Sequence, residues 1–220
     1  MIGVIDYGMG NLRSVEKAFE FLGFVVKIIN QPRDLDHVTH AVLPGVGAFP
    51  DAMNNLNDRQ WVAPLKKFTK ANKPLLGICL GMQLLFEHSD EGGSQTQGLG
   101  LLPGHVSGFA GDAYGGGKLK VPHMGWNAIT WQKNDPLMTG LEQGDYVYFV
   151  HGYHVRTPMD KGDRASESVV TCVSDYPQPI CASVWQRRIW GVQFHPEKSQ
   201  AVGLKMLKNF AAIHSTTQPT

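Results

Sequence analysis

The sequence lacks the features that mark nucleic-acid-binding, membrane-spanning and disulfide-stabilised proteins. Its 220 residues carry 20 Lys and Arg against 19 Asp and Glu, for a formal net charge of +1 and without a basic run, which argues against a nucleic-acid partner. No basic leader opens the chain and no apolar run is long enough to cross a bilayer. The three cysteines are widely spaced without a CxxC pair, as in reduced cytosolic proteins. We therefore expect a cytoplasmic protein without membrane contact.

The first half of the chain alternates short apolar runs with an amphipathic segment. The predicted strands cover residues 2–5, 25–29, 40–43 and 74–78. Residues 11–22 place Leu12, Val15, Phe19 and Leu22 on one face of a predicted helix. Alternation of this kind predicts parallel strands with helices on both faces of the sheet.

The second half has a different pattern. Residues 91–117 are rich in glycine and have no clear period, which predicts loops with one short strand at 101–106. Later predicted strands, in antiparallel hairpins, cover residues 126–130, 146–150, 181–185 and 189–194. A last helix is expected over 200–214, with Leu204, Leu207 and Phe210 facing inward. The chain, with 42% hydrophobic residues, is thus expected to be a single α/β domain over 1–220: an open, mostly parallel sheet flanked by helices, with an added antiparallel portion in the C-terminal half.

Residues 77–81 (Gly-Ile-Cys-Leu-Gly) put Cys79 between a predicted strand and a predicted helix over 82–86. This is the thiol version of the nucleophile elbow, in which flanking glycines allow a sharp turn that exposes the nucleophile. The following helix would point its N-terminus at the sulfur and favour the thiolate. The alternative is an ordinary buried cysteine, and the elbow alone does not decide between them.

A possible base for this nucleophile lies 116 residues downstream, where a strand-like run ends in His195, Pro196 and Glu197. Residues i and i+2 of an extended chain point to the same side, so the imidazole and the carboxylate can meet. A cysteine nucleophile needs a base, and the base needs a group that fixes its tautomer. A surface histidine beside a solvated glutamate is the alternative. Both motifs at predicted strand ends favour a catalytic Cys79–His195–Glu197 triad.

At this point the chain resembles a known family, the class I glutamine amidotransferases, and within them the glutaminase subunits of imidazole glycerol phosphate synthases. The elbow and the His-Pro-Glu motif specify only the broad family. The opening Asp-Tyr-Gly-Met-Gly-Asn-Leu and the later Pro-His-Met-Gly-Trp-Asn narrow it to the subunit type. The matching segments are residues 5–12, 43–47, 77–83, 122–127, 148–151 and 191–199.

Residues 44–47 (Pro-Gly-Val-Gly) directly follow a predicted strand. A simple turn is the common interpretation of a Pro-Gly pair. The resemblance favours an oxyanion loop, in which backbone N–H groups near Val46 and Gly47 stabilise the charged intermediate together with the N–H of Leu80. In the family, one peptide of this loop must turn its N–H inward, and the partner subunit controls that change.

Five residues are candidates for contact with the substrate. Gln83 lies one turn after Cys79 on the predicted helix, where an isolated glutamine is more often exposed. The resemblance favours substrate binding for Gln83, and also for Gly45, His151, Gly152 and Tyr153. The family usually has Ser or Thr where this chain has Gly152, which removes one hydroxyl from the site.

Neither a metal nor a cofactor is expected. His151 and His154 would point to opposite faces of a strand, and His123 lies elsewhere in the sequence. The run Gly8-Met9-Gly10 is not a dinucleotide fingerprint, because Arg13 replaces the third glycine.

Apolar and aromatic residues of the second half would by default pack in the core. The resemblance implies instead that Met124, Trp126 and Tyr148, with Asn11 and Lys198, form an interface with a (β/α)₈ cyclase in a heterodimer. It implies that glutamine is hydrolysed to glutamate and that the cyclase uses the ammonia to make imidazole glycerol phosphate and AICAR. Two alternatives stay open: a paralogue feeding another acceptor, such as a sugar undergoing amidination, and a non-catalytic docking subunit.

Overall fold

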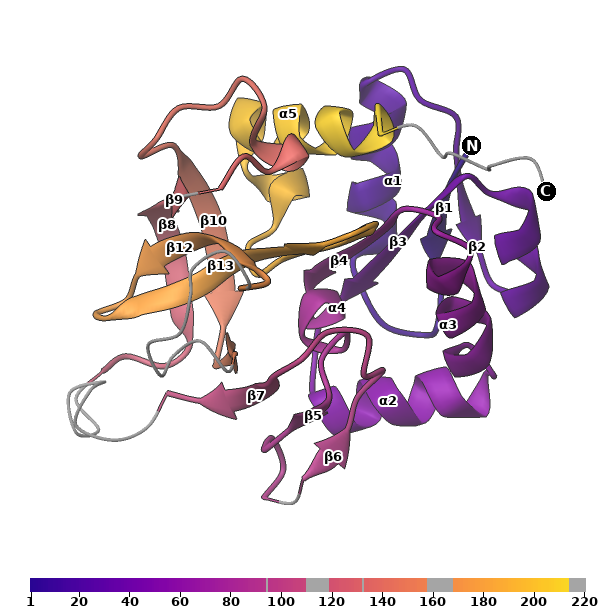
Figure 1. Ribbon diagram of the computed structural model, residues 1–220, viewed down its shortest axis with the longest axis horizontal. Helices are drawn as coiled ribbons and strands as arrows, with labels where there is room; N and C mark the ends of the chain where they lie inside the picture. Colours follow the sequence, from indigo (N-terminus) through magenta and orange to yellow (C-terminus); the bar gives the residue numbers. More distant parts are fainter. Residues whose placement is uncertain (94, 110–118, 132, 158–167, 214–220) are drawn as a thin grey trace.

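An eight-stranded sheet with the order β2-β1-β3-β4-β14-β13-β12-β9 forms the centre of the computed structural model (Figure 1), which describes residues 1–93, 95–109, 119–131, 133–157 and 168–213. The parallel strands are β1 (Ile2–Ile5), β2 (Val26–Ile29), β3 (His40–Gly45), β4 (Leu75–Cys79) and β14 (Ile189–Val192). The antiparallel extension consists of β13 (Pro179–Gln186), β12 (Val170–Asp175) and β9 (Thr130–Trp131). The predicted fold class is confirmed.

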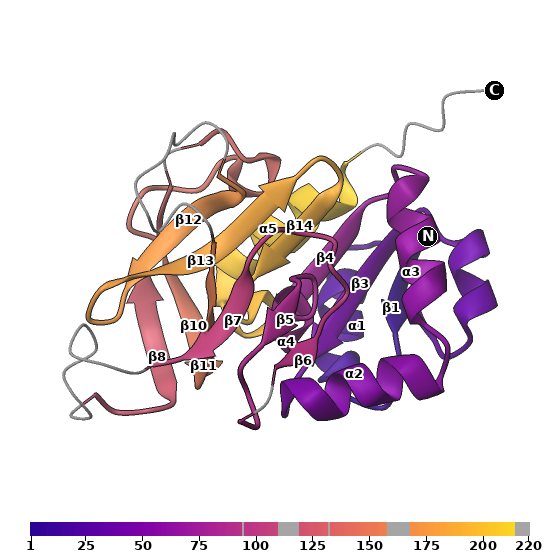
Figure 2. The same ribbon diagram turned by 60° about the horizontal axis from the view of Figure 1, so that its bottom comes forward.

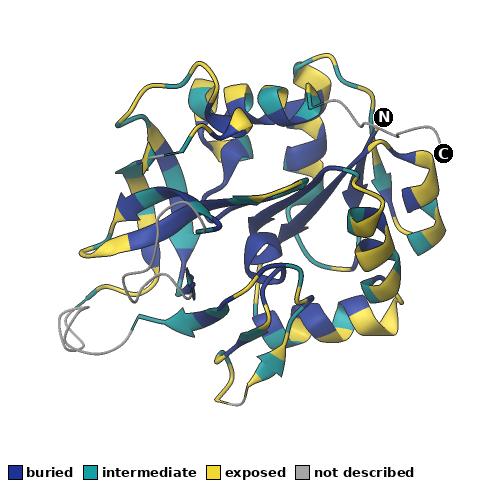
Figure 3. Cartoon of the chain, viewed as in Figure 1, coloured by how far each residue is buried: buried dark blue, intermediate teal, exposed yellow. Residues whose placement is uncertain are grey.

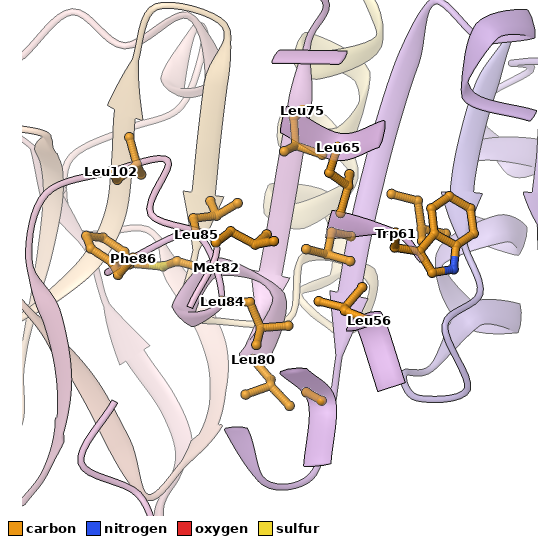
Figure 4. Packing of buried hydrophobic residues seen from close by; sticks show 14 of the residues in the cluster. Leu56, Trp61, Leu65, Leu75, Leu80, Met82, Leu84, Leu85, Phe86 and Leu102 are labelled. Carbon is orange, nitrogen blue, oxygen red and sulfur yellow. The ribbon is translucent and has the colours of Figure 1, made fainter. Parts of the chain in front are cut away.

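Helices cover both faces of the sheet, as the alternation predicted (Figures 1 and 2). On one face, α1 (Leu12–Phe21) and α5 (Gln200–Ala211) bury Val15, Phe19 and Phe210 against the strands. On the other face, α2 (Phe49–Asp58) and α3 (Val62–Lys70) contribute to a second buried cluster (Figure 4) that includes Leu56, Trp61 and Leu65. Burial is therefore densest around the parallel strands (Figure 3).

Two smaller sheets complete the C-terminal part. One pairs β8 (His123–Ala128) with β10 (Tyr146–His151) in antiparallel register. The other has the order β11-β7-β5-β6, with β11 (Tyr153–Arg156), β7 (His105–Gly108), β5 (His88–Ser89) and β6 (Thr96–Gln97). None of the described helices is long and apolar enough to cross a membrane.

Two local predictions are wrong. The helix after the elbow, α4 (Leu80–Gln83), is one turn long, because the carbonyls of Leu84, Leu85 and Phe86 accept hydrogen bonds from residues 99–102 instead of continuing a helix. The same bonds hold residues 101–102 outside any strand, so the strand predicted at 101–106 begins only at His105. The last helix ends at Ala211, and its predicted end at 214 lies outside the described residues, as do 110–117 of the predicted loop.

Candidate active site

Cys79 ends β4 in a strained backbone conformation, with φ 55° and ψ −113°. The flanking glycines are required by neighbouring backbone. A Cβ on Gly81 would lie 1.8 Å from the carbonyl oxygen of Leu43, and a Cβ on Gly77 would lie 2.6 Å from the carbonyl oxygen of Gly81. The predicted sharp turn is therefore present, although only one helical turn follows it.

His195 and Glu197 follow β14, the strand that pairs with β4. Nδ1 of His195 lies 2.8 Å from Oε1 of Glu197, and both side chains are 1% exposed. Burial lowers the pKa of His195, but the Cys79 thiol and the Glu197 carboxylate outweigh it and raise that pKa to about 9. The sulfur is thus close enough to act on the ring, while Nε2 makes no regular hydrogen bond to a described residue.

A cavity of about 380 Å³ brings these side chains together. Cys79 is only 6% exposed, but it borders this cavity together with His195, so the two are not separated by the core. Of the other residues predicted for catalysis, the oxyanion hole or substrate binding, Gly45 and Glu197 lie outside the lining. The lining also includes Val46, Gly47, Leu80, Gln83, His151, Gly152 and Tyr153.

The turn between β3 and α2 approaches the first loop of the chain closely. A Cβ on Gly45 would lie 2.7 Å from the hydroxyl of Tyr7, and one on Gly47, where φ is +104°, would lie 2.6 Å from Cε of Met9. Leu80 is the first residue of α4, so its N–H has no partner within the helix. Val46, Gly47 and Leu80 therefore border the cavity from two neighbouring strand ends.

Gln83 is buried rather than exposed, and its amide nitrogen is already engaged. Nε2 donates to the carbonyl of Tyr153 at 3.0 Å and to Oε1 of Gln193 at 2.9 Å. Gln193, which sequence reasoning missed, also directs its own Nε2 to Sγ of Cys79 at 3.8 Å. Only the oxygen of the Gln83 amide is left for a ligand in this arrangement.

Glu91 is a second residue that sequence reasoning missed. Its side chain borders the cavity, and Oε2 accepts a hydrogen bond from the N–H of Phe49 at 2.9 Å. Burial raises its pKa, and nearby Asp51 adds to the effect. Glu91 lies in a glycine-rich stretch without periodicity, so no sequence signal marked it, yet its carboxylate is suited to pairing with an ammonium group.

The three histidines considered for metal binding are distributed over three strands: His123 in β8, His151 at the end of β10 and His154 in β11. His123 and His151 are partners in the β8–β10 register, and Nδ1 of His123 lies 3.0 Å from Nε2 of His151. Among the described residues, no group of three or more His, Cys, Asp or Glu could hold a metal ion.

The residues predicted for an interface lie toward solvent instead of in the core. Met124 is 60% and Trp126 44% exposed, and both share the outward face of the β8–β10 pair with Tyr148. Lys198 places Nζ 6.0 Å from the ring centroid of Tyr148. The backbone of Tyr148 reaches the site, because its carbonyl accepts the N–H of His195 at 2.9 Å. Asn11, at the start of α1, makes no side-chain capping bond.

Comparison with known proteins agrees with this fold. The family model "Glutamine amidotransferase class-I" matches residues 3–213. The chain therefore belongs to the class I glutamine amidotransferase family, which confirms the resemblance noted in the sequence.

Curated relatives narrow the similarity further. The chain is 49% identical over 211 residues to "Imidazole glycerol phosphate synthase subunit HisH" of Syntrophotalea carbinolica, covering 96% of this chain and 98% of that one. The protein of the same name from Halalkalibacterium halodurans is 49% identical over 214 residues, covering 97% and 96%. A third, from Geobacter sulfurreducens, is 48% identical over 213 residues, covering 96% and 98%.

Solved structures share the fold at lower identity. "Structure of PurLQS from Thermotoga maritima" aligns with a TM-score of 0.71 at 19% identity, covering 96% of both chains. "Crystal structure of glutamine amidotransferase" aligns with a TM-score of 0.70 at 19% identity, covering 96% of this chain and 98% of that one. Likeness at this identity concerns the fold alone.

Proposed function

We propose that this protein is the glutaminase subunit of an imidazole glycerol phosphate synthase in histidine biosynthesis. The observation that carries the proposal is the shared cavity of Cys79 and His195, with Glu197 on the far side of the imidazole. The HisH names of relatives about half identical over nearly the whole chain support the pathway.

The proposed reaction begins with attack of the Cys79 sulfur on the side-chain carboxamide carbon of glutamine. His195 accepts the thiol proton, and its raised pKa, about 9, means that the ring holds this proton at neutral pH. The tetrahedral intermediate then collapses to a thioester as His195 donates the proton to the departing ammonia. Water hydrolyses the thioester and releases glutamate. Glu197 fixes the tautomer of His195 through Nδ1 and stabilises its charge.

Two further groups complete the proposed site. The N–H of Leu80 and a peptide N–H at Val46 or Gly47 would stabilise the oxyanion, and losing one such donor typically costs about 10²–10³ in rate. The Glu91 carboxylate would pair with the α-ammonium group of glutamine, while Gln83, His151, Gly152 and Tyr153 border the remainder of the substrate. No cofactor and no metal take part in these steps.

The proposed partner is a (β/α)₈ cyclase that receives the ammonia and forms imidazole glycerol phosphate and AICAR in the cytoplasm. Exposed aromatic residues and methionine are enriched at protein interfaces, and the outward face of Met124, Trp126 and Tyr148 offers both. A partner bound at this face would contact Tyr148, whose backbone carbonyl is hydrogen-bonded to the N–H of the catalytic His195. Asn11 and Lys198 are the other proposed contacts.

The test is glutamate release from glutamine, measured with and without the cyclase and its ligand. We expect negligible turnover alone and strong stimulation in the complex. Cys79→Ala should abolish the stimulated activity, whereas Cys172→Ala, at a buried free cysteine of β12, should retain it. Equal rates with and without the cyclase would contradict the coupling, and an active Cys79→Ala variant would contradict the nucleophile.

A further inference from the structure

Two buried histidine rings beside the cavity make a continuous series of three contacts at hydrogen-bond distance. Nε2 of His123 lies 2.8 Å from Oδ1 of Asn127, and Nδ1 of His123 lies 3.0 Å from Nε2 of His151. Nδ1 of His151 then lies 2.7 Å from the carbonyl oxygen of Tyr153. The two rings are 1% and 6% exposed, so water does not replace these partners freely.

Both ends of this series accept hydrogen bonds. The Tyr153 carbonyl has no proton to give, so Nδ1 of His151 must carry one. The Asn127 amide is oriented by its nitrogen, which donates to the carbonyl of Asp175 at 3.2 Å. Its oxygen therefore faces His123, and Nε2 of His123 must also carry a proton.

The central bond between the rings then needs a third proton. Two neutral imidazoles supply two protons for three hydrogen bonds, so one bond is not made while both rings are neutral. A single extra proton, shared between Nδ1 of His123 and Nε2 of His151, satisfies all three. The pair is therefore built for one positive charge.

The surroundings oppose this charge in the unliganded protein. Burial lowers the pKa of His123. Burial also lowers the pKa of His151 to about 3, against the Tyr153 carbonyl, which raises it, and the charges of His123, His154 and His195 add to the lowering. The other groups facing the pair are the rings of Tyr176, stacked on His123 with centroids 3.8 Å apart, and of Phe149 and Phe109. The faces of these three rings are compatible with a cation, but none of the three carries a negative charge.

An anionic group in the cavity would change this balance. Apart from His195, whose Nδ1 is paired with Glu197, His151 is the only basic side chain in the described lining. If Glu91 pairs with the α-ammonium group of an amino acid, the α-carboxylate of that amino acid is left to approach the basic ring of His151. We propose that the His123–His151 pair takes up one shared proton when the α-carboxylate of the substrate enters the cavity, with His123 as a positioning residue. This inference rests on the proposed function in taking glutamine as the ligand.

Completing the series would also tighten one wall of the site. The segment from Val150 to Tyr153 carries the carbonyl that lies 3.8 Å from Sγ of Cys79 and the carbonyl that holds Gln83. The third hydrogen bond fixes the ring between these two carbonyls. Substrate binding would therefore order the groups around the nucleophile through a proton.

The experiment is calorimetric titration of glutamine into the Cys79→Ala protein, complexed with the cyclase, in buffers of different ionisation enthalpy. The Cys79→Ala background prevents turnover, and the buffer dependence gives the number of protons taken up. His123→Phe keeps an aromatic ring in the stack, and it should reduce the number of protons taken up on glutamine binding by close to one. His154→Phe, which removes a neighbouring histidine outside the series, should leave that number unchanged. Equal uptake with and without His123 would overturn the proposal.

A second measurement separates this idea from the proposed function. Ring ¹⁵N chemical shifts of the histidines can be followed against pH in the protein without glutamine. Asn127→Asp places an anion beside Nε2 of His123, so it should raise the pH at which the His123–His151 pair becomes charged. If glutamine does not bind, the proposed function fails but these shifts still decide the proton count. If the rings of His123 and His151 titrate identically in wild type and Asn127→Asp, the shared-proton proposal is refuted.

Discussion

The two parts of the molecule that meet at the cavity are built differently. In the parallel part, β3 and β4 are buried along their whole length, and backbone atoms approach so closely that side chains are excluded at Gly77 and Gly81. In the antiparallel part, β10 alternates, with Phe149 buried and Tyr146 exposed. The parallel part therefore tolerates little change around the nucleophile, while the antiparallel part has one face for the core and one for solvent.

The largest effect that this contrast predicts is at the elbow glycine. Gly81→Ala would force a Cβ to 1.8 Å from the carbonyl oxygen of Leu43, so we expect a loss of about 4–5 kcal/mol in the free energy of unfolding or failure to fold. Gly152→Ala is the matched control, since its Cβ would meet only Val121 at 3.6 Å. Chemical denaturation measures both, and equal stabilities would break the comparison.

The next effect distinguishes the two faces of the β8–β10 pair. Phe149→Ala removes a fully buried ring from the core and should cost about 3–5 kcal/mol in the free energy of unfolding. Trp126→Ala, on the outward face, should change it by no more than about 0.5 kcal/mol while weakening binding of the proposed cyclase. Denaturation and a pull-down or titration with the cyclase test both halves. A strongly destabilised Trp126→Ala variant would show that this face is part of the core.

The last prediction concerns pH, and it separates two kinds of buried histidine. The pKa of His195 is raised from 6.5 to about 9, so its contribution to stability is complete below pH 6.5 and is lost as the pH rises through 9. Burial lowers the pKa of His151 to about 3 and of His154 to about 4, so their contributions are present above pH 6.5 and are lost as the pH falls toward those values.

The free energy of unfolding should therefore be highest near neutral pH, with each pKa unit worth about 1.4 kcal/mol at most. Cys79 and Glu197 together raise the pKa of His195, so Glu197→Gln, which removes one of them, should make the alkaline slope shallower and leave the acid slope unchanged. Urea unfolding over a pH series checks this. An alkaline slope that is the same in wild type and Glu197→Gln would contradict a contribution of the His195–Glu197 pair to it.

Much of the framework could be predicted because its signals are local. Apolar runs marked the strands that carry Cys79 and precede His195, and the glycines around Cys79 marked the turn. The length of α4 could not be predicted, because residues 99–102 end it by taking the carbonyls of residues 84–86. Glu91 and Gln193 were missed because their place at the cavity depends on packing between distant segments, which no local pattern records. The strands 153–156 and 170–175 were likewise missed.

The backbone at Cys79 has one more consequence. A residue other than glycine at φ 55° and ψ −113° costs about 1–3 kcal/mol, so the nucleophile occupies the position where the fold would prefer the residue with no side chain. Replacing Cys79 by glycine would give a more durable but inert protein. The requirements of catalysis and of stability oppose each other at this residue, so a screen for thermal stability alone would select against Cys79.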